Sequence, residues 1–378
     1  MKTYLVSQLK KAYSLHVKML SKRTANKKIK QQVVYLLSFP NNNHGLIEAL
    51  SETYQVIVCY TDNMKEEAES LKKFGTLNNN VDTFSGLTKT VKAVSESQIV
   101  LADNYFAFLG DIVKRKEQCF FQLWHATGAI KQFGLEDKKS ALRPKSDQER
   151  FKRVYQSFDY FVVGSKAMGD VFIRSYEVRE SQMCYLGFPR TDYLLKNKET
   201  QKVKIKKIIL YLPTYREKSN QQGLLDMVKL KEHLGDDYEL LVKTHPHAKL
   251  MENKGVIDES NITWLKETDS ADELLLQTDI LITDYSSVAF DYGLINPLGK
   301  LIFYWYDESD YRKETGIQTG VEKTLPNSIC HTLEEVLAEV KNNDQDLSTF
   351  NRTWNTYNDG NATSRLLDVI AEKMDGNK

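Results

Sequence analysis

Two adjacent serines, Ser286 and Ser287, follow a short apolar run at Asp279 to Ile282 and precede apolar residues that recur at helical spacing. This pattern predicts a strand, a turn and a helix that begins at the serines. The first N–H groups of a helix have no partner inside it, so with the helix dipole and two hydroxyls they could bind a phosphate. The alternative is that Asp284 or Ser286 only caps the helix.

His125 follows a second apolar run, Phe120 to Leu123, and a glycine-containing turn comes after it. The pattern predicts a histidine at the end of a buried strand. Such a histidine changes charge near neutral pH, so it could take a proton from an attacking hydroxyl. The alternative is an imidazole that only hydrogen-bonds to neighbouring backbone.

Arg216 follows the apolar run Ile208 to Leu212, where its planar guanidinium would suit phosphate oxygens. His245 and His247 follow the run Glu239 to Val242, and the proline between them disfavours helix at His245, so both imidazoles are expected on a loop. Two histidines without a third ligand nearby favour contact with an anion over a metal site.

These groups are expected to converge, because parallel strands end at one edge of a sheet. Arg216, His245 and the two serines could then hold one diphosphate, with His125 facing it from a different domain. The chemistry implied is in-line attack of a hydroxyl on phosphorus, with the cationic groups stabilising the charge of the transition state. We expect no cofactor and no metal.

The elements that must position these side chains alternate between strand-like and helical stretches along the chain, which predicts an α/β fold. We expect two Rossmann-type, doubly wound domains that face a cleft. The expected division is a basic segment at 1–30, a first domain at 31–195, a linker at 196–207, a second domain at 208–345 and a C-terminal helical segment at 346–378.

The N-terminus is basic: nine Lys and Arg precede the first acidic residue, Glu48. Residues Leu5 to Leu20 place apolar side chains on one face at helical spacing, so a basic amphipathic helix is expected. It could lie on an anionic membrane or dock on the protein's own core. A second basic cluster after His125 could touch the same headgroups or be a solvated helix face. The residues concerned are Lys10, Lys11 and Lys18 in the helix and Lys138, Lys139 and Arg143 in the cluster.

The composition is that of a globular protein, with 378 residues of which 41% are hydrophobic and a formal net charge of +1. No apolar run of eighteen residues occurs, and the N-terminus lacks the apolar core of a secretory signal, so we expect the protein to stay in the cytoplasm. The four cysteines are scattered, which favours reduced core thiols.

Five motifs together resemble one family, the CDP-glycerol glycerophosphotransferases of teichoic-acid synthesis. The resemblance covers roughly Val33 to Gly316. The motifs are Trp124-His125-Ala126-Thr127-Gly128, Leu212-Pro213-Thr214-Tyr215-Arg216, His245-Pro246-His247, Thr283-Asp284-Tyr285-Ser286-Ser287 and Phe290-Asp291-Tyr292. Ala126 departs from the family's pattern, which often has glycine directly after the histidine.

The resemblance implies a GT-B-type fold, CDP-glycerol or CDP-ribitol as donor, and a polyprenyl-diphosphate-linked saccharide or a growing polyol-phosphate chain as acceptor. It implies a peripheral enzyme on the cytoplasmic side of the cell membrane, at an anionic surface. No nucleic acid is expected as partner, and self-association is left open. The short chain is similar in size to the members that add the first unit. A CDP-ribitol transferase, or a glycosyltransferase that uses a nucleotide sugar, is the alternative.

The resemblance also assigns roles to the candidate residues. His125 is the expected base, and His245 is expected as a second catalytic residue at the donor diphosphate. Donor contacts are expected from Arg216, His247, Asp284, Ser286, Ser287 and Asp291. The two aspartates could instead only position the turn or hold a hydroxyl.

Overall fold

The computed structural model describes residues 2–198, 205–214, 216, 224–243, 262–266, 269–327, 329–342 and 344–376. The chain divides into two compact units. The first unit comprises residues 1–125, 140–193 and 357–378, and the second comprises residues 126–139 and 194–356.

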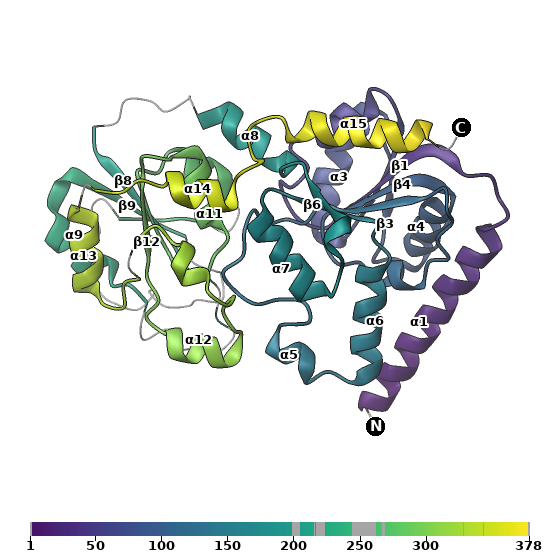
Figure 1. Cartoon of the computed structure of the whole chain (residues 1–378), viewed down its shortest axis with the longest axis horizontal. Coiled ribbons are helices and arrows are strands. Elements are labelled where there is room, and N and C mark those ends of the chain that lie inside the picture. The colour runs from purple at the N-terminus through teal and green to yellow at the C-terminus, as the bar shows by residue number, and fades with distance from the viewer. Residues whose placement is uncertain are drawn as a thin grey trace. The chain divides into compact units, whose positions relative to one another are not determined.

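A sheet of seven parallel strands forms the centre of the first unit (Figure 1), in the order β3-β2-β1-β4-β5-β6-β7. Its central strands are apolar on both faces, because both are covered by helices, and residues 32–37 of β1 are all buried. Successive strands are added on one side of β1 up to β3 and on its other side from β4 onwards. The carboxyl ends of β1 and β4 are therefore the switch point, where sheets of this kind bind ligands. The strands are β1 (Lys30–Leu37), β2 (Gln55–Tyr60), β3 (Leu77–Asn80), β4 (Ser97–Ala102), β5 (Cys119–Gln122), β6 (Tyr160–Val163) and β7 (Met183–Tyr185).

The helices of the first unit include the last one in the chain. Leu366, Ile370 and Met374 of this helix, α15, pack into the core beside the strands, and Gln98 Nε2 donates to the main-chain oxygen of Lys373 at 2.8 Å. The helices are α1 (Lys2–Thr24), α2 (Leu46–Ser51), α3 (Lys65–Leu71), α4 (Phe84–Glu96), α6 (Lys145–Gln156), α7 (Lys166–Tyr176) and α15 (Ala362–Asp375). Two further helices, α5 (Lys138–Ala141) and α8 (Pro189–Asn197), lie where the chain passes from one unit to the other.

The second unit is built on five parallel strands in the order β10-β9-β8-β11-β12. Its switch point lies between β8 and β11. The strands are β8 (Lys207–Leu212), β9 (Tyr238–Val242), β10 (Ile262–Trp264), β11 (Ile280–Thr283) and β12 (Lys300–Phe303). The helices are α9 (Met227–Leu234), α10 (Ala271–Leu276), α11 (Val288–Ile295), α12 (Glu308–Glu314), α13 (Leu333–Lys341) and α14 (Ser348–Trp354).

The α/β architecture with two doubly wound parallel sheets is the one predicted from the sequence. Strand β3 was not predicted, because its sequence Leu-Asn-Asn-Asn lacks an apolar pattern and the strand lies half-exposed at the sheet edge. Neither unit is one continuous stretch of the sequence. Residues 126–139 lie with the second unit, and residues 357–378 lie with the first.

Helix α1 confirms the predicted N-terminal helix, and its two halves differ. In the second half Val17 and Ser21 are fully buried, so this part docks on the fold, as one alternative held. In the first half Leu5 and Leu9 are 61% and 62% exposed. No helix in the described ranges is both long and apolar enough to cross a membrane.

Candidate active site

The switch point of the first unit is closed by a buried carboxylate. Asp103 directly follows β4, and its side chain is fully buried. It accepts hydrogen bonds from the main-chain N–H of Ser38 at 2.8 Å, from the Ser38 hydroxyl at 2.9 Å and from the N–H of Phe39 at 2.9 Å. Burial raises the pKa of Asp103 to about 7, although these three bonds lower it.

His125 follows β5 and lies beside the main chain of Asp103. Its Nδ1 contacts the main-chain oxygen of Asp103 at 3.1 Å, and its ring stacks on Phe39 with centroids 4.2 Å apart and 17° between the planes. A carbonyl oxygen only accepts, so in this contact Nδ1 carries the proton and the neutral ring keeps its lone pair on Nε2. His125 therefore hydrogen-bonds to neighbouring backbone, as the alternative from the sequence held, and its Nε2 still has a basic lone pair.

Trp124, directly before His125, lies in a strained turn. Its φ of 62° is left-handed, a conformation that is costly for a bulky residue. The turn is held by hydrogen bonds on both sides, since Gln122 Oε1 accepts from the Trp124 N–H at 2.9 Å and Asn42 Nδ2 donates to the Trp124 oxygen at 2.7 Å. Strain of this kind is found where a side chain must be aimed.

The switch point of the second unit is also closed by an aspartate, Asp284, which directly follows β11. This carboxylate is almost fully buried and accepts from the N–H of Thr214 at 2.8 Å, from the Thr214 hydroxyl at 2.5 Å and from the N–H of Tyr285 at 2.6 Å. The carboxylate thus fixes the turn between β11 and α11, which is the turn-positioning role that the sequence left open.

Arg216 binds two carboxylates of its own unit. Its Nη2 lies 2.8 Å from Asp284 Oδ2, its Nε lies 2.7 Å from Asp307 Oδ2, and its Nη1 donates to the Thr214 oxygen at 2.7 Å. The guanidinium also lies over the ring of Tyr311, 4.8 Å from the centroid. Burial opposes its charge, but the bond to Asp307 and the charge of Asp284 raise the pKa of Arg216 further. Sequence reasoning missed Asp307, which lies far from Arg216 in the chain.

The predicted serines lie at the start of α11. Ser286 Oγ accepts from the N–H of Val288 at 3.4 Å, while Ser287 occupies the position just before the first helical residue, and both side chains are half-buried. Asp291, one turn into the helix, is buried and accepts from the hydroxyl of Thr127. His245 and His247 lie outside the described residues.

Residues 126–139 form a crossing segment, which follows His125 and packs on the second unit. Gln132 N–H donates to the Gly316 oxygen at 3.0 Å, and Gln318 N–H donates to the Ile130 oxygen at 2.7 Å. Lys131 lies between these bonds with an accessible side chain. The charge of Lys131 interacts favourably with that of Asp284 and unfavourably with that of Arg216. Lys131 is therefore a cation near the second switch point that the sequence reasoning missed.

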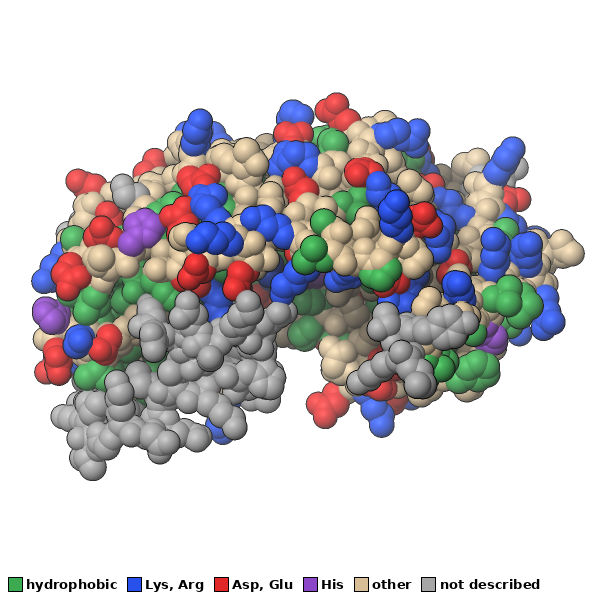
Figure 2. All heavy atoms as spheres, turned by 90° about the horizontal axis from the view of Figure 1, so that it is seen from below, with side chains coloured by type: hydrophobic (Ala, Val, Ile, Leu, Met, Phe, Trp, Pro, Cys, Tyr) green, Lys and Arg blue, Asp and Glu red, His purple; other side chains and the backbone are tan. Residues whose placement is uncertain are grey.

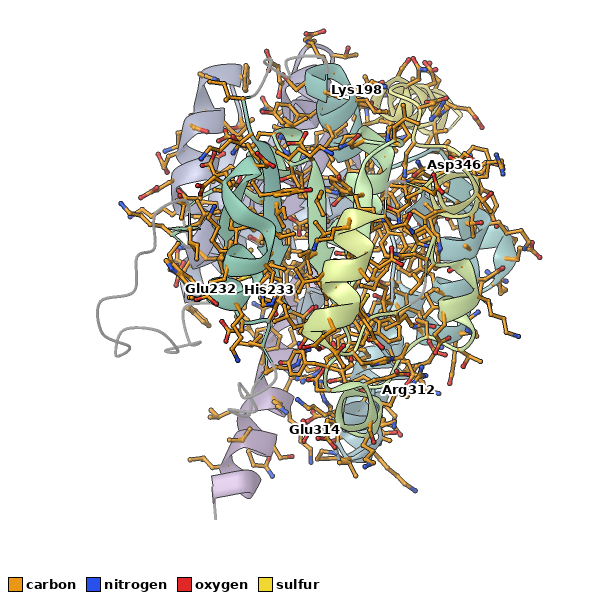
Figure 3. The ribbon with its side chains drawn as sticks, turned by 90° about the vertical axis from the view of Figure 1, so that its left-hand side faces the viewer. Lys198, Glu232, His233, Arg312, Glu314 and Asp346 are labelled. Atoms are coloured by element: carbon orange, nitrogen blue, oxygen red, sulfur yellow. The ribbon has the colours of Figure 1, made fainter. Side chains whose placement is uncertain are left out.

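The basic residues expected at a membrane have varied surroundings. Lys10 pairs with Asp147 of α6 at 2.6 Å, while Lys11 and Lys18 are exposed. Lys138 donates to the main-chain oxygen of Arg312 on α12, a residue that Figure 3 labels. Figure 2 shows Lys and Arg side chains next to hydrophobic ones at the end of the view that α1 occupies. The two remaining residues of the cluster, Lys139 and Arg143, are exposed.

Comparisons with known proteins identify relatives over most of the chain. The model of the family CDP-glycerol:poly(glycerophosphate) glycerophosphotransferase matches residues 19–372. The teichoic acid glycerol-phosphate primase of Bacillus subtilis (strain 168) is 33% identical over 364 residues, which are 91% of this chain and 92% of the relative. The teichoic acid ribitol-phosphate primase of Bacillus spizizenii is 31% identical over 72% of this chain and 75% of its own.

Among solved structures, the wall teichoic acid polymerase TagF superposes with a TM-score of 0.71 at 20% identity, over 98% of this chain and 99% of the other. At this level of identity the match shows the fold alone, which is GT-B-like.

Proposed function

Since the chain belongs to the CDP-glycerol:poly(glycerophosphate) glycerophosphotransferase family, we propose that it transfers one glycerol phosphate from CDP-glycerol to a hydroxyl of a polyprenyl-diphosphate-linked disaccharide and releases CMP. The observation that carries this proposal is the match to a glycerol-phosphate primase over nine tenths of both chains.

In the proposed reaction the acceptor oxygen attacks the phosphorus that bears the glycerol. A new P–O bond forms, the bond from this phosphorus to the bridging oxygen of the diphosphate breaks, and CMP leaves with the electron pair. His125 Nε2 takes the proton of the acceptor hydroxyl. This assignment is supported by the bond from Nδ1 to Asp103, which leaves the lone pair on Nε2.

The donor diphosphate is proposed to bind at the start of α11, where N–H groups and the hydroxyls of Ser286 and Ser287 suit an anion. His245 and His247, which follow β9 in the sequence, would add positive charge. The N–H groups of Arg216 already bind the carboxylates of Asp284 and Asp307. We therefore expect Arg216 to act on the donor indirectly, by holding Asp284 and with it the turn between β11 and α11. Asp291 has the same indirect role through Thr127.

The test of the reaction is CMP release from CDP-glycerol with a short-chain lipid-linked disaccharide. We expect His125→Ala to abolish release. The matched control is His233→Ala on α9 (Figure 3), because the Nδ1 of His233 also contacts a main-chain oxygen, that of Lys229 at 2.7 Å, but on an exposed helix. Absence of turnover with every CDP-polyol would refute the proposal, and full activity of His125→Ala would refute the role of the base.

The donor is tested by thermal shift, because a ligand that binds the folded state raises the melting temperature. We expect CDP-glycerol to stabilise the protein more than CDP-ribitol does, and UDP-sugars to have no effect. A larger shift with CDP-ribitol would assign the protein to the ribitol branch, in line with the ribitol-phosphate primase among its relatives. A shift with UDP-sugars alone would make it a glycosyltransferase.

We also propose that the enzyme works at the cytoplasmic membrane surface, held there by the first half of α1. Support comes from Leu5, Leu9 and Lys11, which are all exposed in this half of the helix. Flotation with anionic vesicles tests this with Leu5→Ser combined with Leu9→Ser, which should abolish binding without unfolding the protein. Leu298→Ser is the control, since Leu298 is 87% exposed in the second unit. Unchanged binding by the double variant would exclude this surface.

A further inference from the structure

The two switch points share one arrangement of hydrogen bonds. In each unit an aspartate directly follows the fourth strand, and its carboxylate receives an N–H and a hydroxyl from a residue just beyond the first strand. The pairs are Asp103 with Ser38 in the first unit and Asp284 with Thr214 in the second. In the second unit the carboxylate also binds Arg216. In the first unit the carboxylate of Asp103 also accepts from the N–H of Phe39, and the ring of Phe39 stacks on His125.

Asp103 reaches His125 by two routes. Its main-chain oxygen receives the Nδ1–H of the imidazole, which fixes the tautomer. Its carboxylate holds the N–H of Phe39, whose ring covers one face of the imidazole at 4.2 Å. Asp103 therefore bears both on which nitrogen is basic and, through Phe39, on how the ring is oriented, while the Trp124 ring also contacts the imidazole with centroids 4.2 Å apart.

We propose that Asp103 is the positioning residue of His125, acting through its main-chain oxygen and through the Ser38–Phe39 turn that its carboxylate holds. The inference rests on the proposed function of His125 as the base. Asp103 makes no contact with substrate in this proposal. Phe39 is the residue through which the Asp103 carboxylate acts on the imidazole ring. A shift of about 1 Å in a reacting group can lower a rate about 100-fold, so losing this support should lower the rate strongly.

The kinetic test uses Asp103→Asn, because an asparagine amide presents one acceptor oxygen and an NH₂ group that opposes the N–H donors. We expect kcat to fall about 100-fold while KM for CDP-glycerol stays unchanged. Phe39→Ala should have an effect in the same direction, and Phe39→Tyr, which restores the stacked ring, should recover most of the activity.

The control is Asp159→Asn at the opposite edge of the same sheet. Asp159 precedes β6, accepts from the N–H of Phe120 at 2.7 Å and pairs with Lys114 at 2.5 Å. It therefore also caps backbone with a carboxylate, but at the amino ends of the strands. A variant that only loosened the sheet would resemble Asp159→Asn, which we expect to keep kcat.

A second readout does not depend on activity. With ¹⁵N-labelled histidine, the neutral His125 ring of the wild type should show a protonated Nδ1 and an unprotonated Nε2, and Asp103→Asn should shift this signal towards a tautomer mixture. The proposal is overturned if Asp103→Asn, folded by circular dichroism, keeps both kcat and the His125 signal. If Asp103→Asn does not fold, Phe39→Ala decides, since Phe39 is 38% exposed.

The two readouts separate the failure of this proposal from that of the proposed function. If His125→Ala keeps full activity, His125 is not the base, yet the tautomer signal still shows whether Asp103 positions the ring. If His125→Ala is inactive while Asp103→Asn and Phe39→Ala behave as wild type, the role of His125 as base is supported and the positioning role of Asp103 is refuted.

Discussion

The bond between Thr127 and Asp291 should contribute more to stability than an ordinary buried hydroxyl bond. Thr127 is fully buried, and its hydroxyl donates to the carboxylate of Asp291, which is 4% exposed. A hydrogen bond to a charged group contributes about 1.5–3 kcal/mol, against about 0.5–1.5 kcal/mol for a neutral one. Thr127→Val keeps the shape of the side chain and removes this bond.

The matched control is Thr283→Val in the same unit. Thr283 is also fully buried, but its hydroxyl donates to a neutral acceptor, the main-chain oxygen of Leu212, at 2.6 Å. We expect Thr127→Val to lower the unfolding free energy about twice as much as Thr283→Val does, measured by urea denaturation. A double-mutant cycle with Asp291→Asn should give a coupling energy of about 1 kcal/mol or more.

Function should respond as well. Thr127 is two residues from His125, so the two Cα atoms lie at most about 7 Å apart whatever the arrangement of the units. Freeing Thr127 from α11 should therefore lower kcat in CMP release, and Thr283→Val should not. Equal destabilisation by the two variants, or a cycle without coupling, would refute the reasoning.

Three further predictions follow from the same geometry. Gly128→Ala places a Cβ 2.6 Å from the buried ring of Phe290, so it should destabilise the protein by about 1–3 kcal/mol in thermal unfolding. Arg216→Lys keeps the charge but loses the fork that joins Asp284 to Asp307, so activity should fall while circular dichroism stays unchanged. The folded-state pKa of Asp103, about 7, lies above its ordinary 3.8, so the folded state binds its proton more tightly. Its contribution to stability should therefore fall from about pH 4 to pH 7, by up to about 4 kcal/mol, and Asp103→Asn should lack this slope in urea titrations.

The strands that carry the candidate residues could be predicted because buried parallel strands are apolar on both faces. The run Phe120 to Leu123 corresponds to β5 and the run Ile208 to Leu212 corresponds to β8, each within one residue. Asp103 was missed although it directly follows the buried strand β4, and a place after a buried strand is the same signal that pointed to His125. A polar residue at the carboxyl end of a buried parallel strand is a candidate site residue.

Other features of the site depend on contacts that no local pattern encodes. The crossing segment is continuous with β5 in sequence and has no linker composition, so its packing on the second unit comes only from tertiary bonds such as that of Thr127 with Asp291. Arg216 was expected at a phosphate because of its place after β8. Its partner Asp307 lies 91 residues away, and sequence alone does not show that a carboxylate fills that place.

The return of α15 to the first unit affects how the protein is made. Domains usually fold as they emerge from the ribosome, the N-terminal one first. Here the core of the first unit includes Leu366, Ile370 and Met374, while every residue of the second unit precedes them in the chain. The unit that is begun first is therefore finished last, and a chain truncated before α15 would contain the whole second unit and a first unit with an open core.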